Sequence, residues 1–228
     1  MGDVDDRRLT PKGRATRERI VKTAAELIVQ HGVAGTSIDD VRQATGVSGS
    51  QMTHYFTDKR SLVRVVIAWQ ADAVVALHQL PVLGELDSFE ALDMWCELNI
   101  ARQRRASCQG GCGFGSLAGE LAEDETRTDL ARGFERWEAL FRHGLRLMKQ
   151  RGELRPDADI DELAMGLLAA LQGGLLLTRT RRDIRPVEAA LRTMVAHVRS
   201  FATDEAARAD TGRKPAVRRK AARLVAAL

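Results

Sequence analysis

Apolar residues recur at the spacing of an α-helix along nearly the whole chain, and this periodicity limits the fold more than any other feature. Apolar and polar residues hardly ever alternate, and runs of β-branched residues are short, so strands have little support. The sequence therefore predicts an all-α protein. The expected helices span residues 16–31, 37–45, 48–55, 58–80, 88–105, 115–122, 124–151, 159–181 and 186–201.

The composition is that of an ordinary globular protein. The 228 residues are 44% hydrophobic and 29% charged, which suits one large domain or two small ones. The acidic start MGDVDDRR has no apolar stretch behind it, which argues against a signal or transit peptide. The longest apolar run, residues 164–178, contains a Gln and is shorter than the roughly 20 residues of a membrane span. We expect a cytoplasmic protein with no membrane partner.

The net charge of +4 arises at one end of the chain. Residues 205–228 carry seven Lys or Arg and two acidic residues, whereas residues 1–204 have a net charge of −1. Binding of nucleic acid by the folded part must therefore come from a local patch and not from a global field. The basic tail, residues 204–228, is predicted to be loosely ordered.

The chain has three cysteines, Cys96, Cys108 and Cys112. An odd number without a secretory signal argues against a disulfide framework. The spacing of Cys108 and Cys112, with no His at metal spacing, is a poor zinc motif, because structural zinc usually has four ligands in tighter pairs. The default interpretation is small buried or pocket-lining thiols. We expect neither a metal nor a cofactor.

Two short helices with a glycine between them indicate a helix-turn-helix. Ser37 and Asp40 have the spacing of a capping box, and Ser48 and Gln51 repeat it. Gly46 can take the left-handed conformation that ends the first of these helices. The polar face of the second helix is then free to enter a major groove. The alternative is a short helical hairpin with a solvated face, and periodicity alone gives the two interpretations equal weight.

The stretch GTSIDDVRQATGVSGSQMTHYFTDKRSL, residues 35–62, resembles the DNA-binding signature of the tetracycline-repressor (TetR) family. Members read T-x-x-x-I-A-x-x-A-G-V-S, then a short recognition helix that ends in Tyr-x-x-Phe or Tyr-Phe, then x-x-K-x-x-L. The match covers residues 14–62. In the divergent remainder, GCGFGSLAGELA, RWEALFRHGL and RGELRPDAD are similar to the branch that contains lincomycin-resistance-operon repressors.

The resemblance implies where the chain would touch double-stranded operator DNA. The start of the second helix and Lys59 would meet phosphates, and the recognition helix would face bases. Thr53 stands where an aromatic residue is common, and Gly49 where Lys or Arg is frequent, so the local charge is thinner than usual. The implied contacts are Thr36, Ser37, Ser48, Gly49, Ser50, Gln51, Thr53, His54, Tyr55 and Lys59.

The chemistry of these side chains agrees with the resemblance. A Gln can bond an adenine through two hydrogen bonds, which suits Gln51. Lys59 lies in the first turn of a helix, where free amide groups already favour an anion. Arg7, Arg8, Lys12 and Arg14 form a basic arm ahead of the first helix. That arm either lies in a minor groove or on phosphates, or is a disordered terminus without a partner.

We expect residues 1–15 to form the arm, 16–60 a three-helix DNA-binding domain and 61–203 a helical ligand-binding and dimerisation domain. The resemblance implies a homodimer formed through the last two helices. Two apolar stripes could supply that surface, or both could face the core of the single chain. The stripes are Ile160, Leu163, Leu167, Leu171 and Leu175, and Val187, Leu191, Met194, Val198 and Phe201.

Large aromatic residues concentrate in the second domain. Singly, each is most simply a core residue, but together with the glycines of GGCGFG they allow a cavity with a few polar groups. Gln172 interrupts the apolar run LLAALQGGLLL, where an amide needs a partner or a pocket. We expect a small, apolar, multi-ring effector. The candidate pocket residues are Trp69, Trp95, Asn99, Phe114, Phe134, Trp137, Phe141 and Gln172.

The leading hypothesis is a homodimeric transcriptional repressor that a small effector releases from its operator, and not an enzyme. The first alternative is a helical thiol enzyme that uses Cys108 or Cys112, although the sequence shows no catalytic partner for either. The second alternative is a helical adaptor for protein partners, which leaves Gln51 and Lys59 unexplained.

Overall fold

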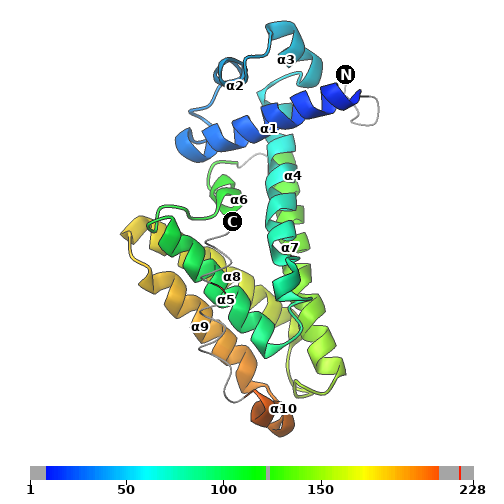
Figure 1. Ribbon diagram of the computed structural model, residues 1–228, viewed down its shortest axis with the longest axis vertical. Coiled ribbons are helices and arrows are strands. Elements are labelled where there is room, and N and C mark those ends of the chain that lie inside the picture. Colours follow the sequence, from blue (N-terminus) through cyan, green and yellow to red (C-terminus); the bar gives the residue numbers. More distant parts are fainter. Residues whose placement is uncertain (1–8, 122–123, 211–220, 222–228) are drawn as a thin grey trace. The chain divides into compact units, whose positions relative to one another are not determined.

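The structure is a computed structural model that describes residues 9–121, 124–210 and 221, and their fold is helical (Figure 1). In these residues no strand forms, and one isolated bridge joins Leu154 to Ala202, so the predicted all-α fold is confirmed. The helices are α1 (Pro11–His31), α2 (Ile38–Thr45), α3 (Gly49–Tyr55), α4 (Lys59–His78), the 3₁₀ turn η2 (Pro81–Leu83), α5 (Phe89–Arg105), α6 (Gly113–Leu117), α7 (Asp124–Gln150), α8 (Ile160–Arg181), α9 (Arg185–Ser200) and α10 (Asp204–Ala209).

The chain forms two compact units whose limits differ from the predicted domains. Unit 1 comprises Met1–Ala73 and Gly113–Gly133, and unit 2 comprises Val74–Cys112 and Phe134–Leu228. Unit 1 therefore includes residues 61–73 of α4, α6 and the start of α7, all of which the sequence analysis places in the second domain. Long-range contacts join these segments to one another, since Arg64 of α4 forms an ion pair with Asp129 of α7 at 2.7 Å.

The first helix begins earlier than the periodicity indicates. Thr10 is its N-cap, with the Thr10 hydroxyl accepting a hydrogen bond from the Gly13 amide at 3.2 Å. Pro11 occupies the first helical turn, where its missing N–H costs nothing. Lys12 and Arg14 therefore lie in α1 and not in a flexible arm. Residues 1–8, with the other two arginines of the predicted arm, lie outside the described residues.

The beginning of the predicted loose tail is also helical. α10 spans Asp204–Ala209, with two acidic residues in its first turn, where they suit the helix dipole. Arg199 of α9 anchors this helix through an ion pair to Asp210 at 2.5 Å, and it also pairs with Asp93 of α5 at 2.8 Å. The remainder of the tail, residues 211–220 and 222–228, lies outside the described residues.

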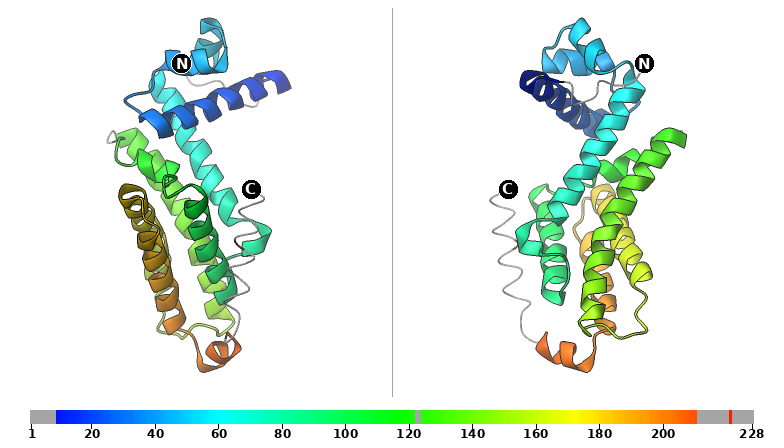
Figure 2. Two further views of the ribbon diagram at one scale, coloured as in Figure 1. Left: turned by 60° about the vertical axis from the view of Figure 1, so that its left-hand side comes forward. Right: turned by 90° about the vertical axis from the view of Figure 1, so that its right-hand side faces the viewer.

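The core of unit 2 contains both predicted dimer stripes. α8 and α9 lie side by side (Figure 2) and make the most extensive helix–helix contact of the described chain. Two glycines allow the close approach, because a Cβ at Gly166 would lie 2.9 Å from Met194 Cε and one at Gly174 would lie 3.0 Å from Val187 Cα. Of the stripes, Ile160, Leu163, Leu167, Leu171, Leu175, Val187, Leu191 and Val198 are buried in the single chain, and Met194 and Phe201 are half-buried.

The stripes therefore hold α8 and α9 to the rest of their own chain, which favours the second of the two alternatives, a core role, over a dimer surface. Periodicity cannot distinguish a core stripe from an interface stripe, because both are apolar at the same spacing.

Two helices, α4 and α8, are long and apolar enough to cross a membrane by length and composition alone. This is weak support for a span, because the core helices of soluble proteins meet the same criterion. In α8 the apolar residues that meet it include the buried stripe that packs on α9.

Candidate nucleic-acid interface and effector pocket

The turn between α2 and α3 has the geometry that the sequence predicts. Ser37 Oγ accepts the Asp40 amide proton at 3.1 Å, and Asp40 Oδ2 accepts the Ser37 amide proton at 2.8 Å. The hydrogen bonds from Ser37 lower the pKa of Asp40 below its ordinary value. Gly46 then ends α2 in the left-handed region with a φ of 68°. The first capping box and the glycine stop are both confirmed.

The second capping box has a consequence for base recognition. Ser48 Oγ accepts the Gln51 amide proton at 3.2 Å, and Gln51 Oε1 accepts the Ser48 amide proton at 2.9 Å. The side-chain oxygen of Gln51 is thus engaged in holding the start of α3. A two-bond contact with adenine uses both the oxygen and the amide NH₂ group, so with the capping box closed Oε1 would have to accept the adenine proton on its second lone pair.

The rest of the predicted base-reading face is exposed. Ser48, Gly49, Ser50, Gln51, Thr53 and His54 are all exposed, whereas Met52 and Phe56 are buried as expected of core positions. Thr53 Oγ1 donates to the Gly49 carbonyl at 2.7 Å, which leaves the hydroxyl oxygen free to accept. α3 therefore presents short polar side chains over a core of Met52 and Phe56.

Three other predicted DNA contacts have different surroundings. Thr36 is only 4% exposed, and its hydroxyl donates to the Gly32 carbonyl at 2.8 Å. Tyr55 is likewise buried, and its ring meets the edge of His54. Lys59 is half-buried, and its Nζ lies 3.4 Å from the carbonyl oxygen of Ala34. The hydroxyl of Thr36 serves the chain's own turn, and we do not retain it as a phosphate contact. Ser37 is exposed at the start of α2.

The core of unit 2 contains a buried histidine, His78, that the sequence analysis did not predict as a functional or structural residue. His78, at the end of α4, accepts the indole protons of Trp95 at 2.8 Å and of Trp137 at 3.0 Å on the same atom, Nε2. Its Nδ1 donates to the Val74 carbonyl at 2.7 Å. An imidazole that donates from one nitrogen and accepts at the other is neutral. Phe141 adds an edge-to-face contact at 5.6 Å.

Burial keeps this histidine neutral. It lowers the pKa of His78 from 6.5 to about 4, the hydrogen bond to Val74 opposes the fall, and the positive charge of Arg102 adds to it. The signal in the sequence was a histidine at the end of an apolar helix, 17 residues before Trp95 of the next long helix. The aromatic content of the sequence pointed to Trp95 and Trp137, but it did not indicate that His78 Nε2 accepts a hydrogen bond from both.

The other predicted pocket residues are divided between the two units. In unit 2, Asn99 donates to the Trp95 carbonyl at 2.9 Å, and Gln172 Nε2 lies 3.8 Å from Cys112 Sγ. Phe134 stacks on Trp137, with the ring planes 5° apart. Trp69 and Phe114 belong to unit 1. Neither of the two surface cavities described for this chain is lined by any of the eight predicted residues.

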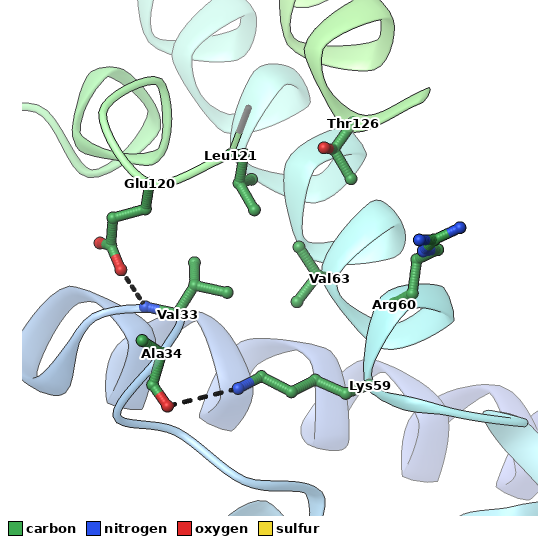
Figure 3. Close-up of a pocket in the computed structure, with 8 residues that line it drawn as sticks. All are labelled: Val33, Ala34, Lys59, Arg60, Val63, Glu120, Leu121 and Thr126. Atoms are coloured by element: carbon green, nitrogen blue, oxygen red, sulfur yellow. Dashed lines mark hydrogen bonds between the residues drawn. The ribbon is translucent and has the colours of Figure 1, made fainter. Parts of the chain in front are cut away.

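One of those cavities lies in unit 1 and the other in unit 2. The first has a volume of about 460 Å³ and is lined from the end of α1, the start of α4 and the segment around α6 and α7 (Figure 3). The second has a volume of about 480 Å³ and is lined by the starts of α5 and α10 and the turn after α7.

The second capping box predicts a stability effect of Gln51 in the absence of DNA. Gln51→Ala removes the acceptor for the Ser48 amide, so the free energy of unfolding should fall by about 0.5–2 kcal/mol. Urea unfolding measures this, with His54→Ala as an exposed control that should change stability by less than about 0.5 kcal/mol. Equal stability of the two variants would show that the capping box contributes nothing.

The neutral state of His78 predicts a pH effect. Between about pH 6.5 and pH 4, His78 is protonated in the unfolded chain but remains neutral in the folded chain. The contribution of neutral His78 to the free energy of unfolding is therefore fully present above pH 6.5 and is lost as the pH falls towards 4. The loss should reach about 3 kcal/mol at pH 4. Urea unfolding of the native protein and of His78→Gln at pH 7 and pH 4.5 measures it. Parallel losses in both proteins would contradict a special role of His78.

Comparisons with known proteins identify the family of this architecture. Residues 20–66 match the profile described as bacterial regulatory proteins, tetR family, and residues 88–194 match that of the tetracyclin repressor-like C-terminal domain. An uncharacterised HTH-type transcriptional regulator of Mycobacterium tuberculosis is 30% identical over 175 residues, which cover 75% of this chain and 88% of the relative. The HTH-type transcriptional repressor DhaR of Mycobacterium sp. (strain GP1) is 24% identical, over 75% of this chain and 86% of the relative.

Solved structures agree with the sequence relatives. A TetR transcriptional regulator from Chloroflexus aurantiacus superposes with a TM-score of 0.68 at 25% identity, over 85% of this chain and 98% of that one. These relatives are transcriptional regulators, which confirms the prediction of a regulator and not an enzyme. The chain belongs to the TetR family of DNA-binding transcriptional regulators.

Proposed function

We propose that this regulator is a homodimeric repressor that a small, apolar, multi-ring effector releases from its operator. The observation that carries the proposal is the pair of capped helices, α2 and α3, which present an exposed polar face over a buried core. A relative described as a repressor, DhaR, supports the direction of regulation.

The recognition helix reads DNA with short side chains. Ser50, Thr53 and His54 are exposed along α3 and can approach base edges or phosphates in a major groove. The side-chain amide NH₂ of Gln51 can donate without disturbing the capping box, because the capping box uses the side-chain oxygen. A single seven-residue helix offers few contacts, so affinity and specificity require two copies, held about 34–36 Å apart in successive major grooves.

A face of α8 that is exposed among the described residues of its own chain supplies the dimer surface. Met165 and Leu176 are 59% and 66% exposed, and Leu177 is exposed beside them. A Cβ at Gly173 would meet nothing within 4 Å, so a second helix can approach closely there. Exposed apolar residues of this size on a folded chain are typical of an interface, and paired α8–α9 hairpins form a four-helix bundle.

The effector site belongs among the aromatic residues of unit 2. Phe134 and Trp137 offer parallel rings for a flat ligand, and Gln172 and Asn99 offer amide groups at the edge. Both indole protons are already bound to His78, so a polar group of the effector would bond the amides and not the indoles. We further propose that the part of the chain after residue 62 belongs to the branch of lincomycin-resistance-operon repressors, on the similarity of residues 111–122, 136–145 and 151–159.

The dimer is tested through its effect on DNA binding. DNA fragments selected by the purified protein should contain two half-sites about one helical turn apart. Leu176→Glu places a charge on the α8 face, so the protein should become monomeric in analytical ultracentrifugation and lose operator affinity by more than tenfold. Gln150→Glu adds the same charge at the exposed end of α7 and should remain dimeric. A Leu176→Glu variant that stays dimeric would overturn the assigned face.

The effector is tested by tryptophan fluorescence. A Trp69→Phe variant leaves Trp95 and Trp137 as reporters in unit 2. Multi-ring phenolics or lipophilic antibiotics that quench them should lower operator affinity by about 5- to 150-fold. Gln172→Ala should weaken effector binding by about tenfold, with Gln150→Ala as an exposed control. Quenching without loss of operator affinity would show that binding at this site does not control DNA binding. The absence of quenching by any of these compounds would contradict an effector site at Trp95 and Trp137.

A further inference from the structure

Glu120 makes a contact with the DNA-binding helices that the function described so far does not use. It follows α6, and its Oε2 accepts the backbone proton of Val33 at 2.6 Å (Figure 3). Val33 lies in the turn that joins α1 to α2. The contact therefore joins two segments of unit 1 that are 87 residues apart in the sequence.

The turn is built to receive this carboxylate. Gly32 ends α1 with a φ of 77°, a conformation that favours glycine. A Cβ at Gly32 would also lie 2.8 Å from Glu120 Oε2, closer than real Cβ contacts allow. The absence of a side chain at Gly32 thus permits the backbone conformation, and the carboxylate of Glu120 lies where a Cβ at Gly32 would stand.

Polar contacts hold the turn between α1 and α2, and a cavity lies beside it that apolar side chains do not fill. The cavity of about 460 Å³ is lined by Val33, Ala34, Lys59 and Glu120, among others. Across it, Lys59 Nζ lies 3.4 Å from the Ala34 carbonyl oxygen, a longer contact than that of Glu120 (Figure 3). At the other end of the turn, the Thr36 hydroxyl bonds the Gly32 carbonyl. Of these side-chain contacts, that of Glu120 is the shortest, and its acceptor is a carboxylate, which strengthens the hydrogen bond.

We propose that Glu120 is a positioning residue for DNA binding, whose carboxylate holds the α1–α2 turn and thereby the placement of α2 and α3 on α1. α2 packs directly on α1, and α3 follows α2 after a tight turn. A shift at Val33 is therefore passed to the recognition helix, although Glu120 itself touches no DNA.

The direction in which DNA affinity changes on removal of Glu120 distinguishes a positioning role from a purely electrostatic one. Removing an exposed negative charge near a DNA-binding surface should strengthen binding to every duplex. Positioning predicts the opposite for Glu120→Ala, because the Val33 amide loses its acceptor. It also predicts that Glu120→Gln retains most of the affinity, since the amide oxygen can still accept the proton.

The experiment measures operator and random-duplex affinity of the full chain by fluorescence anisotropy at one salt concentration. Glu120→Ala should lose about tenfold in operator affinity, with little change on random DNA, and the Val33 amide should exchange faster with solvent. Glu125→Ala, which removes a carboxylate that pairs with Arg64, is the charge control and should bind at least as tightly as the native protein.

Three outcomes would overturn the proposal. Glu120→Ala could bind the operator as tightly as the native protein or more tightly, or Glu120→Gln could lose as much affinity as Glu120→Ala. The Val33 amide could also keep its slow exchange in Glu120→Ala, which would show that the turn does not depend on the carboxylate. The hydrogen-exchange measurement needs no DNA, so it remains decisive if the selected operator is in doubt.

Discussion

A single imidazole nitrogen organises unit 2. His78 Nε2 accepts protons from the indoles of Trp95 and Trp137, so the end of α4, the middle of α5 and the middle of α7 meet at one acceptor. Two indole N–H groups buried without an acceptor would each cost free energy, so these helices cannot separate without exposing or orphaning them. The same arrangement requires a neutral imidazole, because a protonated one has no acceptor to offer.

In unit 1, polar contacts also stabilise the fold, but these contacts lie at the surface. The α2–α3 motif is too short to bury much apolar area, and capping boxes at both helix starts compensate by satisfying backbone amides. The side chains that cap are drawn from the same set that DNA recognition would use. Gln51 is the clearest case, since its side-chain oxygen caps the start of α3 and its amide NH₂ group can still donate to DNA. Stability and base reading therefore share residues.

Local features were predictable because they depend on residues close in sequence. The capping boxes of Ser37 with Asp40 and of Ser48 with Gln51, and the glycine stop at Gly46, all appear as expected. The predicted helices are present, with ends displaced by a few residues. The start of α1 was missed because Thr10 and Pro11 form a capping signal outside the apolar periodicity.

Long-range features were not predictable, since no local pattern records which faces meet. The sequence by itself determined the helical class and the helix-turn-helix, because periodicity, capping and turn chemistry act within a few residues, and the resemblance of residues 35–62 to a known signature indicated the family. Only the tertiary structure decided that the stripes of α8 and α9 are core, since that depends on Gly166 and Gly174 allowing close approach. It also decided that His78 joins two tryptophans and that Glu120 reaches Val33, because both contacts join groups that only the fold brings together.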